Sequence, residues 1–424
     1  MLIVRSTKCS LLASNESKRA YLKAFLEEYG RVCNCFVDVF FALPKPPEKA
    51  ELLKPVLAQV QDTWLTERAK KVAAREAIDM INSVRELERG RSKRLEVKRL
   101  KNERAKLVRL LRKHDQPIPD YKFVEVKVPD EAIENESLTK PVHAGRSMNV
   151  SSTIARLEEA KGAGFDVWLV LESLTTHVRG VKLKLPIKLH KHFKKLAARG
   201  KRLASYVITE KAVQFAFEIN TGPKRDDGPR IGVDTGMKRA LAATSEGDLF
   251  GTKIWSKLET IDRKVRGSRG DQRARRALKH YMDETVKEVM KVTPRLVVVE
   301  TLKGISHKTK VRRRLSRTMR RFVGNWAWKY WLKRLQAACE DGRSAFRSTS
   351  PRNTSRTCPV CGFVDERNRT EGAFLCQRCS HADHADTVGG KNVLSFFLAG
   401  PYGTSFRDPV DTEAASNLVG VGHG

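Results

Sequence analysis

The sequence predicts a multidomain α+β protein, and three observations lead to this class. The chain has 424 residues, more than one typical domain holds, so we expect two to four folding units. Segments with the alternation of β-strands, near the start and at residues 165–219, enclose a long helical block, residues 16–141. A strand-rich second half then contains two C-x-x-C pairs, which indicate a small metal-bound module.

The charge of the chain indicates a polyanionic partner. The formal net charge is +33 and the sequence pI is about 10.0, an excess that favours nucleic acid before a membrane surface. No run of about 18 uncharged apolar residues is present, so a transmembrane helix is not expected. The apolar stretch at the start of the chain, within Met1–Lys8, is too short for the apolar region of a signal peptide and is soon followed by charged residues. We therefore expect an intracellular, reduced protein.

The N-terminal residues predict a strand followed by a capped helix. Leu2 and Val4 fall on one face of the strand and Ile3 on the other, a pattern typical of a strand with one wet face. Asn15 can cap a helix that ends before Pro44. Its apolar positions recur at helical spacing and predict a core-facing stripe: Leu22, Phe25, Leu26, Tyr29, Cys33, Phe36, Val37 and Phe40.

The helical block predicts two or three helices between Val56 and Lys113. Residues 91–113 hold 11 Lys or Arg against two Glu, more positive charge than helical ion pairs can neutralise. A solvated basic helix is the plain explanation of such a run. The charge of the whole chain favours instead a surface that follows a phosphate backbone, with Arg91, Arg94 and Lys98 as candidate contacts.

Strands are predicted at residues 165–171, 179–186 and 213–219, after a loop at 114–141. Together with the N-terminal strand they suggest a small β-barrel interrupted by the helical block. Residues 221–229, with the sequence TGPKRDDGP, are predicted to be a linker.

Two acidic residues in the second half each follow an apolar strand. Asp234 ends the segment that begins at Ile231, and Glu300 ends a β-branched run that begins at Leu296. A carboxylate at the end of a buried strand is costly unless it is paired, protonated or bound to a metal. Taken singly, Asp234 is equally consistent with a capping residue and Glu300 with an ion-pair partner.

A third acid, Asp386, lies near the start of a predicted helix, with neighbouring Asp383 as its rival. Three carboxylates that fold together can hold two Mg²⁺ ions about 4 Å apart for cleavage of a phosphodiester bond. Carboxylates suit Mg²⁺ because it is a hard ion that prefers oxygen ligands.

Residues 301–334 contain no acid and 12 Lys or Arg, with a cluster of tryptophans toward the end. Basic residues interleaved with aromatic rings are typical of nucleic-acid surfaces. The spacing of Trp328 and Trp331 with Leu335 instead indicates the buried side of a helix running to about Glu340. We therefore assign the rings to the core and the arginines to nucleic acid: Arg312, Arg313, Arg314, Arg317, Arg320 and Arg321.

The four clustered cysteines, Cys358, Cys361, Cys376 and Cys379, have the spacing of a zinc ribbon. Two disulfides or free core thiols are the alternatives, but an adjacent C-x-x-C pair makes a poor structural disulfide. The other four cysteines, Cys9, Cys33, Cys35 and Cys339, are scattered, and we expect them to be small buried apolar side chains.

Several of these motifs, in order, resemble the split RuvC-like nuclease of TnpB proteins and of the related compact type V CRISPR effectors. They are GVD ending at Asp234 and followed by Gly236, VVVE ending at Glu300, NTSRTCPVCG from Asn353 to Gly362, and Asp386 followed by Asn392. The likeness is specific over residues 230–395. It is looser before that, where residues 188–193, KLHKHF, also look like TnpB.

The resemblance implies an RNase H-like (RuvC) fold with an inserted zinc ribbon, preceded by a wedge-type barrel with a helical recognition lobe. The implied domains are the wedge barrel (1–15 and 142–225), the helical lobe (16–141), the RuvC-like nuclease (230–350 and 381–398), the zinc-ribbon insert (351–380) and a flexible tail (399–424). It also implies that Asp234, Glu300 and Asp386 are catalytic, metal-binding acids, since the spacing of the family favours Asp386 over Asp383. Arg369 looks like the arginine that some relatives place near the scissile phosphate.

The implied function is an RNA-guided, Mg²⁺-dependent DNA endonuclease of a bacterial or archaeal cytoplasm, with guide RNA and double-stranded DNA as partners and structural Zn²⁺ in the ribbon. The alternatives are an unguided RNase H-fold nuclease or transposase and a catalytically weak RNA-guided binder. One or two copies per guide remain open.

The chain departs from the family at Val388-Gly389-Gly390, where relatives commonly have an asparagine and two alanines. We expect each glycine to weaken the helix behind Asp386 by about 1 kcal/mol.

Overall fold

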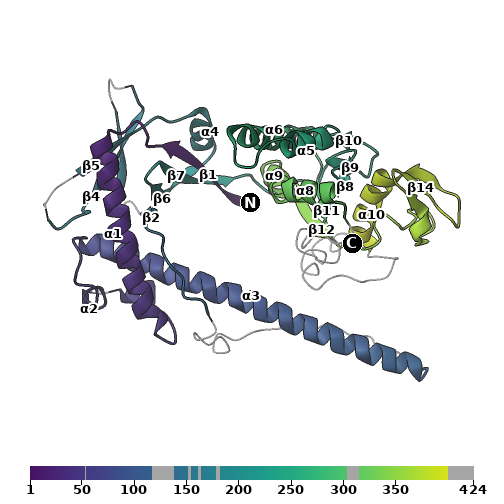
Figure 1. Cartoon of the computed structure of the whole chain (residues 1–424), viewed down its shortest axis with the longest axis horizontal. Coiled ribbons are helices and arrows are strands. Elements are labelled where there is room, and N and C mark those ends of the chain that lie inside the picture. The colour runs from purple at the N-terminus through teal and green to yellow at the C-terminus, as the bar shows by residue number, and fades with distance from the viewer. Residues whose placement is uncertain are drawn as a thin grey trace, which may run out of the picture. The chain divides into compact units, whose positions relative to one another are not determined.

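The computed structural model describes residues 1–52, 54–116, 138–150, 154–160, 164–177, 182–302 and 315–399. The chain divides into two compact units, Val4–Asn220 and Thr221–Gly424 with Met1–Ile3, whose elements are labelled in Figure 1. The division falls at the start of the predicted linker. The finer domain boundaries inferred from the sequence remain predictions, and most of the predicted tail lies outside the described residues.

The N-terminal unit is built from helices and two antiparallel sheets. Its helices are α1 (Glu16–Phe41), α2 (Lys54–Leu57), α3 (Glu67–Lys113) and α4 (Lys191–Arg199). Its strands are β1 (Leu2–Ser10), β2 (Ser147–Val150), β3 (Ala155–Glu159), β4 (Val167–Glu172), β5 (Lys182–Ile187), β6 (Lys201–Thr209) and β7 (Ala212–Asn220).

Helix α1 forms as the sequence predicts. The Asn15 side chain accepts a hydrogen bond from the backbone N–H of Lys18, which caps the helix. All eight positions of the predicted apolar stripe are buried. Helix α1 packs against α3, and the burial of the stripe places it in the core.

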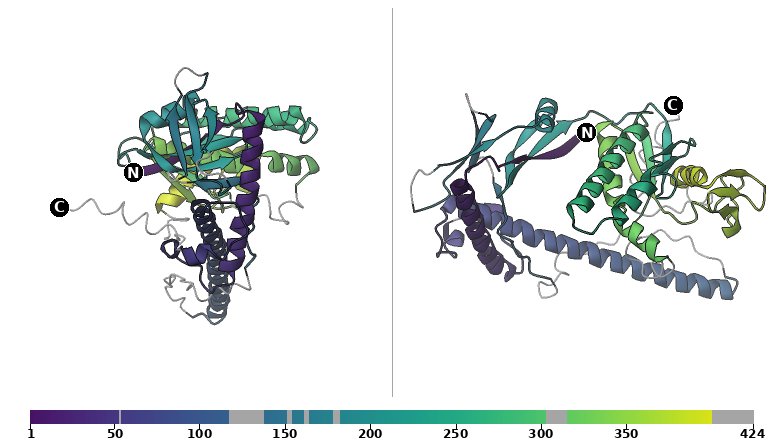
Figure 2. Two further views of the ribbon diagram at one scale, coloured as in Figure 1. Left: turned by 90° about the vertical axis from the view of Figure 1, so that its left-hand side faces the viewer. Right: turned by 45° about the horizontal axis from the view of Figure 1, so that its top comes forward.

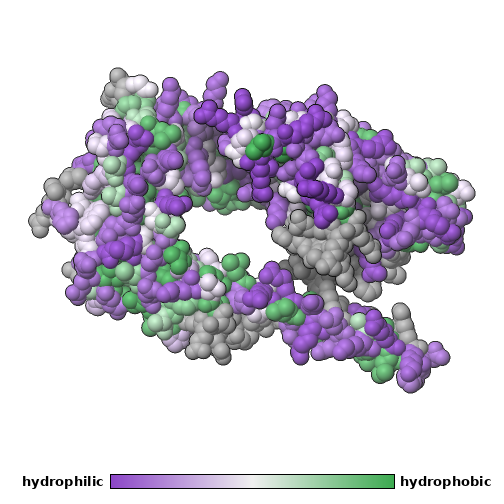
Figure 3. Space-filling view, in the orientation of Figure 1, coloured by the Kyte–Doolittle hydropathy of each residue, from purple (hydrophilic) through white to green (hydrophobic). Residues whose placement is uncertain are grey.

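Helix α3 is a single helix of 47 residues, and with the short helix α2 it makes two described helices where two or three were predicted. Its first half packs in the core through small and β-branched residues, among them Ala73, Ala77 and Ile81. No side chain described in α3 after Ile81 is buried. Figure 2 shows this second half extending past the other elements of its unit, and Figure 3 shows that it carries mainly hydrophilic residues. Arg91, Arg94 and Lys98 are exposed there.

The predicted strands at 165–171, 179–186 and 213–219 correspond to β4, β5 and β7. The structure divides the strands of this unit into a four-stranded sheet, β1-β7-β6-β2, and a three-stranded sheet, β3-β4-β5. The closed barrel therefore remains a prediction. Strands β2, β3 and β6 were not predicted, because they contain few of the alternating apolar residues by which strands are recognised.

The C-terminal unit contains a five-stranded mixed sheet with helices on both faces. Its strands are β8 (Arg230–Thr235), β9 (Ala242–Thr244), β10 (Leu249–Phe250), β11 (Leu296–Glu300) and β12 (Ala345–Thr349). Its helices are α5 (Ile254–Asp262), α6 (Arg269–Met290), α8 (Arg317–Asn325), α9 (Trp328–Asp341) and α10 (Ala385–Ala399). The strand order is β10-β9-β8-β11-β12, with β8, β11 and β12 parallel and the β8–β9 and β9–β10 pairs antiparallel.

The two faces of this sheet follow from the alternation of side chains along its strands. Val297 and Val299 belong to the core formed with α5, α6 and α9. Leu296 and Val298 belong to a smaller core with Val393 of α10. The even-numbered positions of β11 therefore face α10, and Glu300 continues this series.

The predicted assignment of the aromatic residues to the core is confirmed for Trp326 and Trp331, whereas Trp328 and Tyr330 are half-buried and pack against that core. Trp331, Leu335 and Cys339 of α9 are fully buried, and Trp326 is 6% exposed. Of the scattered cysteines, Cys9, Cys33 and Cys339 are buried and Cys35 is half-buried. Among the described helices, none is both long and apolar enough to cross a membrane.

Candidate active site

Two of the predicted acids lie at the carboxyl ends of neighbouring strands in the sheet. Strands β8 and β11 are parallel neighbours, with Val233 opposite Val299, so Asp234 and Glu300 follow at the same level of both strands. Both lie at positions that face α10. Asp386 lies in the first turn of α10. It is close enough to Asp234 for their charges to interact, as Glu300 is, and we call these three residues the acid cluster: Asp234, Glu300 and Asp386.

The pKa of Asp234 shows how closely these groups interact. Burial raises this pKa well above its ordinary value, and the negative charges of Glu300 and Asp386 raise it further, while Arg369 opposes them. Burial also raises the pKa of Glu300, against the hydrogen bond from Thr354 and the charge of Arg369. A cluster of partly buried carboxylates destabilises itself unless protons or cations neutralise it, so this arrangement fits a site for a hard cation.

The rival acid Asp383 lies outside this cluster and has its own partner. Its Oδ2 accepts a hydrogen bond from Lys391 Nζ at 2.7 Å, and its Oδ1 accepts one from the backbone N–H of His384. These partners lower the pKa of Asp383 against the effect of its burial. The geometry therefore favours Asp386 over Asp383 as the third acid, as the family spacing does.

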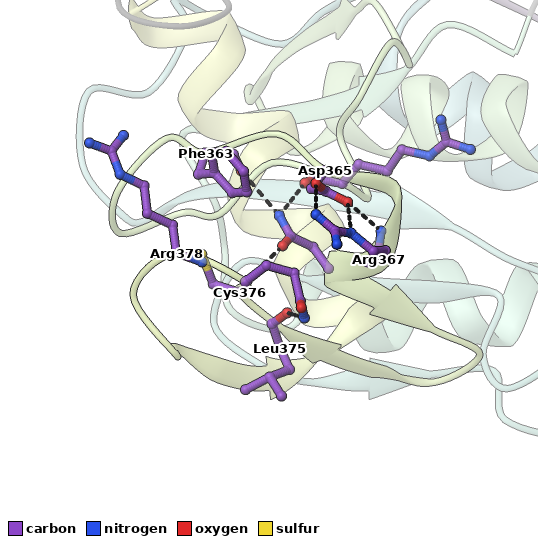
Figure 4. Close-up of polar contacts among 9 residues, drawn as sticks. Phe363, Asp365, Arg367, Leu375, Cys376 and Arg378 are labelled. Atoms are coloured by element: carbon purple, nitrogen blue, oxygen red, sulfur yellow. Dashed lines mark hydrogen bonds and ion pairs between the residues drawn. The ribbon is translucent and has the colours of Figure 1, made fainter.

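Arg369 directly contacts the acid cluster. Its Nη2 lies 3.1 Å from Asp386 Oδ1, and its Nε donates to the carbonyl of Glu371. Neighbouring Arg367 instead forms two 3.0 Å hydrogen bonds with Asp365, an ion pair that Figure 4 shows. Of these two arginines, Arg369 is the one within reach of the acids.

Helix α10 approaches the sheet through glycines. A Cβ on Gly389 would lie 2.7 Å from Asp234 Oδ2, and one on Gly390 would lie 2.8 Å from the carbonyl carbon of Thr244. A Cβ on Gly232 of β8 would lie 2.1 Å from the carbonyl oxygen of Gly390. The two helical glycines, which the sequence suggested only as weak points, are the positions where α10 lies against the sheet.

The four cysteines come together as a cysteine cluster: Cys358, Cys361, Cys376 and Cys379. Their Sγ atoms all lie within 4.8 Å of one another, with Cys358–Cys379 at 3.6 Å and Cys361–Cys376 at 3.5 Å. A tetrahedral Zn²⁺ with Zn–S bonds of about 2.3 Å requires sulfur separations of about 3.8 Å. The cluster therefore has the composition and spacing for zinc.

Two tight turns hold the thiols in this arrangement. Gly362 follows the first pair with φ of +71°, a conformation that favours glycine. Cys376 Sγ accepts hydrogen bonds from the backbone N–H groups of Arg378 and Cys379, both at 3.4 Å. Burial raises the pKa of the Cys376 thiol, but these hydrogen bonds and those of the neighbouring thiols outweigh it and lower the pKa to about 6. A thiol with a lowered pKa is readily deprotonated to the thiolate that binds zinc.

Buried Asn368 joins three parts of the cysteine-containing segment. Its Nδ2 donates to the carbonyls of Arg356 and Phe363, and its Oδ1 accepts from the backbone N–H of Gln377. Figure 4 shows this region, with the Arg378 side chain extending away from the others. The role of Asn368, whose side chain is fully buried, was not predicted from the sequence.

The contact of Thr354 with the acid cluster was not predicted from the sequence either. Thr354 donates a hydrogen bond from its hydroxyl to Glu300 Oε1. The resemblance covered Thr354 only as part of the motif before Cys358, and that motif is the signal through which this residue could have been found.

The predicted nucleic-acid contacts are only partly described. Arg317, Arg320 and Arg321 of α8 are exposed, and Arg321 forms an ion pair with Asp262 at 2.9 Å. Arg312, Arg313 and Arg314 lie outside the described residues. The exposed arginines lie on a helix that packs through Phe322 and Val323.

Comparison with known proteins identifies one part of the chain. A family model described as "Cas12f1-like, TNB domain" matches residues 328–393, from the start of α9 through the cysteine cluster into α10. No curated protein matches the sequence.

The fold of the chain is similar to that of compact type V effectors. One solved structure is CasPhi-2 (Cas12j) bound to crRNA and phosphorothioate-DNA, with a TM-score of 0.51, 10% identity, and coverage of 96% of this chain and 92% of that chain. The mini-RNA-guided endonuclease CRISPR-Cas_phi3 gives a TM-score of 0.49 at 11% identity, covering 96% and 94%. A complex of Cas12f1 with sgRNA and target DNA gives 0.30 at 11% identity, covering 92% and 99%.

The resemblance found in the sequence is thereby confirmed for the fold and for the segment 328–393. The chain has a mixed α/β, multidomain fold resembling compact Cas12 effectors. It carries, in addition, a four-cysteine cluster that can bind zinc.

Proposed function

We propose that this chain is an RNA-guided DNA endonuclease whose single site cuts phosphodiester bonds with divalent metal ions. The observation that carries the proposal is the gathering of Asp234, Glu300 and Asp386 where the parallel strands β8 and β11 end against α10, with the charges of Glu300 and Asp386 raising the pKa of Asp234. The strand order and the mixture of parallel and antiparallel pairs in this sheet support its assignment as RNase H-like.

The domain roles follow the same proposal. The sheets of the N-terminal unit take the role of the wedge and its helices that of the recognition lobe, while the mixed sheet takes that of the RuvC-like nuclease. The neighbour CasPhi-2 is bound to crRNA and DNA, and its fold supports guide RNA and target DNA as the partners here. Exposed basic residues on α3 and α8 would then contact phosphates, so binding should weaken steeply with salt.

The acid cluster has the donor set for two Mg²⁺ ions. Asp234, Glu300 and Asp386 would hold them by carboxylate oxygens, the ligands that Mg²⁺ prefers. When bound, the ions supply activation of water and stabilisation of the leaving oxygen in an in-line cleavage.

The chain's own residues then orient the substrate. In the structure Asp386 is paired with Arg369 at 3.1 Å. With Asp386 serving as a metal ligand, the guanidinium of Arg369 would be available to contact a phosphate oxygen beside the acids, a role that its planar geometry suits. Arg369 is accordingly proposed to position the scissile phosphate.

The cysteine cluster is proposed to hold one structural Zn²⁺. Its four ligands leave no open position for a substrate, which is typical of structural sites. The cluster also shares a small core with α10, through Cys358, Cys376 and Val388. Bound zinc would therefore stabilise the end of the helix that carries Asp386.

The test begins with the RNA that co-purifies with the full chain. We expect a discrete RNA, and we expect that replacing the variable end of that RNA redirects Mg²⁺-dependent cleavage to a matching DNA. Asp234→Asn and Glu300→Gln should each lower cleavage on the order of 10³-fold or more, with DNA affinity of the loaded complex nearly unchanged.

Each alternative function has its own outcome in this experiment. Cleavage by RNA-free protein, with no dependence on a guide, would show an unguided nuclease instead. Guide-dependent DNA binding by the wild type without any product would show a catalytically weak binder. Full cleavage by Asp234→Asn would refute the assignment of the acids.

A further inference from the structure

The loop that leads into the first cysteine pair is held by one buried side chain of α10. Asn392 is 2% exposed, and its Nδ2 donates to the carbonyls of Thr354 and Thr357, both at 2.7 Å. An amide nitrogen has two hydrogens, and both are used here. The two contacts tie both ends of the Thr354–Thr357 turn to the helix that carries Asp386.

The turn is also ordered within itself. Asn353 has a φ of +63°, and its carbonyl accepts hydrogen bonds from the backbone N–H groups of Arg356 and Thr357, both at 3.0 Å. The next residue is Cys358 of the cysteine cluster. The turn is therefore fixed from two sides, by the thiol cluster after it and by α10 across it.

This turn presents Thr354 to the acid cluster. The Thr354 side chain is buried, at 2% exposed, and its Oγ1 donates to Glu300 Oε1 while lying 3.2 Å from the carbonyl of Pro351. A hydroxyl has a single hydrogen to donate, and donation to an ionised carboxylate gives the stronger hydrogen bond of the two.

Glu300 needs such a partner more than an aspartate does. A glutamate has one more rotatable bond than an aspartate, and fixing its side chain costs more rotamer entropy, up to about 1.5–2 kcal/mol. A hydrogen bond to one carboxylate oxygen selects one orientation and leaves the second oxygen for other ligands. Groups that orient metal ligands in this way commonly change metal affinity or activity about 10- to 100-fold when they are removed.

We propose that Thr354 is a positioning residue for Glu300, and that Asn392 keeps Thr354 in place. The cysteine-containing segment thereby orients the second acid of the cluster, in addition to any contact it makes with nucleic acid. This inference rests on the proposed function, because Glu300 is taken as a metal ligand.

The test compares three variants of the full chain loaded with its RNA. Thr354→Val removes the hydroxyl with little change in shape, Thr354→Ser keeps the hydroxyl, and Thr285→Val is the matched control. Thr285 is 3% exposed and donates only to the carbonyl of Tyr281 in α6. It therefore reports what the loss of a buried threonine hydroxyl does by itself.

We expect Thr354→Val to lower kcat at least about tenfold with KM for DNA little changed, and to weaken Mn²⁺ binding about tenfold, measured by electron paramagnetic resonance titration. Thr354→Ser should restore both quantities to within about threefold of the wild type, and Thr285→Val should alter neither. Asn392→Asp, which loses both donor hydrogens, should lower kcat like Thr354→Val. Because both act through Glu300, the double variant should be little worse than either single variant.

Two results would overturn the inference alone: Thr354→Val with wild-type kcat and Mn²⁺ affinity, or Thr354→Ser as impaired as Thr354→Val. A wild type that does not cleave DNA but binds Mn²⁺ in a Thr354-dependent way would support the inference and refute the nuclease function. A wild type that neither cleaves nor binds Mn²⁺ would overturn both.

Discussion

The acid cluster and the cysteine cluster lie in the same unit, but the chain assembles them in different ways. The cysteines come from residues 358–379, and two turns with backbone hydrogen bonds bring their thiols within 4.8 Å of one another. The acids come from β8, β11 and α10, between residues 234 and 386. Among the described residues, the cysteines are the one group of three or more candidate ligands with so tight a spacing.

The difference shows which site depends on the rest of the fold. The thiols of the cysteine cluster are brought together by turns within residues 358–379, although the cluster also packs against α10. The acid cluster forms only if two parallel strands have the right register and α10 packs against them. Its third member, Asp386, is also paired with Arg369 of another segment. We therefore expect the cysteine cluster to be broken only by changes to itself, and the acid cluster to be sensitive to changes in packing around it.

The largest expected effect comes from removing zinc. Cys376→Ser should abolish stoichiometric zinc, measured by elemental analysis, and lower the melting temperature of the C-terminal unit by many degrees. The reason is that structural zinc contributes about 10–16 kcal/mol of apparent binding free energy in small zinc modules. Cys35→Ser is the control, because Cys35 is half-buried and remote in sequence, and this variant should keep its zinc. Unchanged zinc content in Cys376→Ser would remove the metal assignment.

A smaller effect is expected from Gly389→Ala. The sign of the change in the free energy of unfolding shows whether helix propensity or packing dominates at this position. Propensity alone predicts a gain of about 1 kcal/mol in the free energy of unfolding. The added methyl would lie 2.7 Å from Asp234 Oδ2, so we expect a net loss of about 1–3 kcal/mol together with reduced cleavage.

The control for this variant is Gly324→Ala in α8. A Cβ at Gly324 has no atom within 4 Å, so this change should leave stability unchanged or raise it. Thermal melts of both variants give the measurement. A stabilised Gly389→Ala protein with full cleavage would show that the close approach of α10 is not required.

An effect comparable to that of Gly389→Ala is expected from pH in metal-depleted buffer without chelator, conditions under which tightly bound zinc should stay in place. Burial and the neighbouring acids raise the pKa of Asp234 in the folded state. The folded protein therefore binds the proton more tightly than the unfolded chain, and stability should fall as pH rises between about pH 5 and pH 8. Added Mg²⁺ should remove this decline, and so should Asp234→Asn. A stability that rises with pH in this range would contradict the raised pKa.

The smallest effect is expected from Asp383→Asn. The ion pair with Lys391 is partly exposed, with side-chain exposures of 22% for Asp383 and 40% for Lys391, and such pairs contribute about 0–1 kcal/mol. Cleavage should remain close to that of the wild type, whereas Asp386→Asn should abolish it. Equal loss of cleavage in both variants would show that the two aspartates cannot be separated.

Much of the fold was predictable where a signal is local. Asn15 and the apolar stripe of α1 define a helix through capping and period, and the apolar runs ending at Asp234 and Glu300 define buried strands. The length of α3 was not predicted, since nothing in the sequence marks where its buried half ends and its exposed half begins. Gly90, the single glycine of α3, does not break the helix.

The contribution of the glycines could not be read from the sequence. Propensity describes a residue within its own helix, and by that measure Gly389 and Gly390 are defects. Their absence of a side chain allows α10 to lie close to the sheet, where a Cβ would collide with Asp234 or Thr244 of other elements. The same reason explains why the contact of Thr354 with Glu300 was missed.

The sequence by itself predicted the four clustered cysteines and the two strands that end in acids, because spacing and hydrophobic pattern act over short stretches of chain. The residues alone left Asp383 as a rival of Asp386, which the family spacing favoured, and the tertiary structure added the contacts of Arg369 with Asp386 and of Thr354 with Glu300. These relations depend on where α10 lies against the sheet. That position results from contacts between residues far apart in the chain, such as Gly390 with Gly232 and Thr244, which no local pattern records.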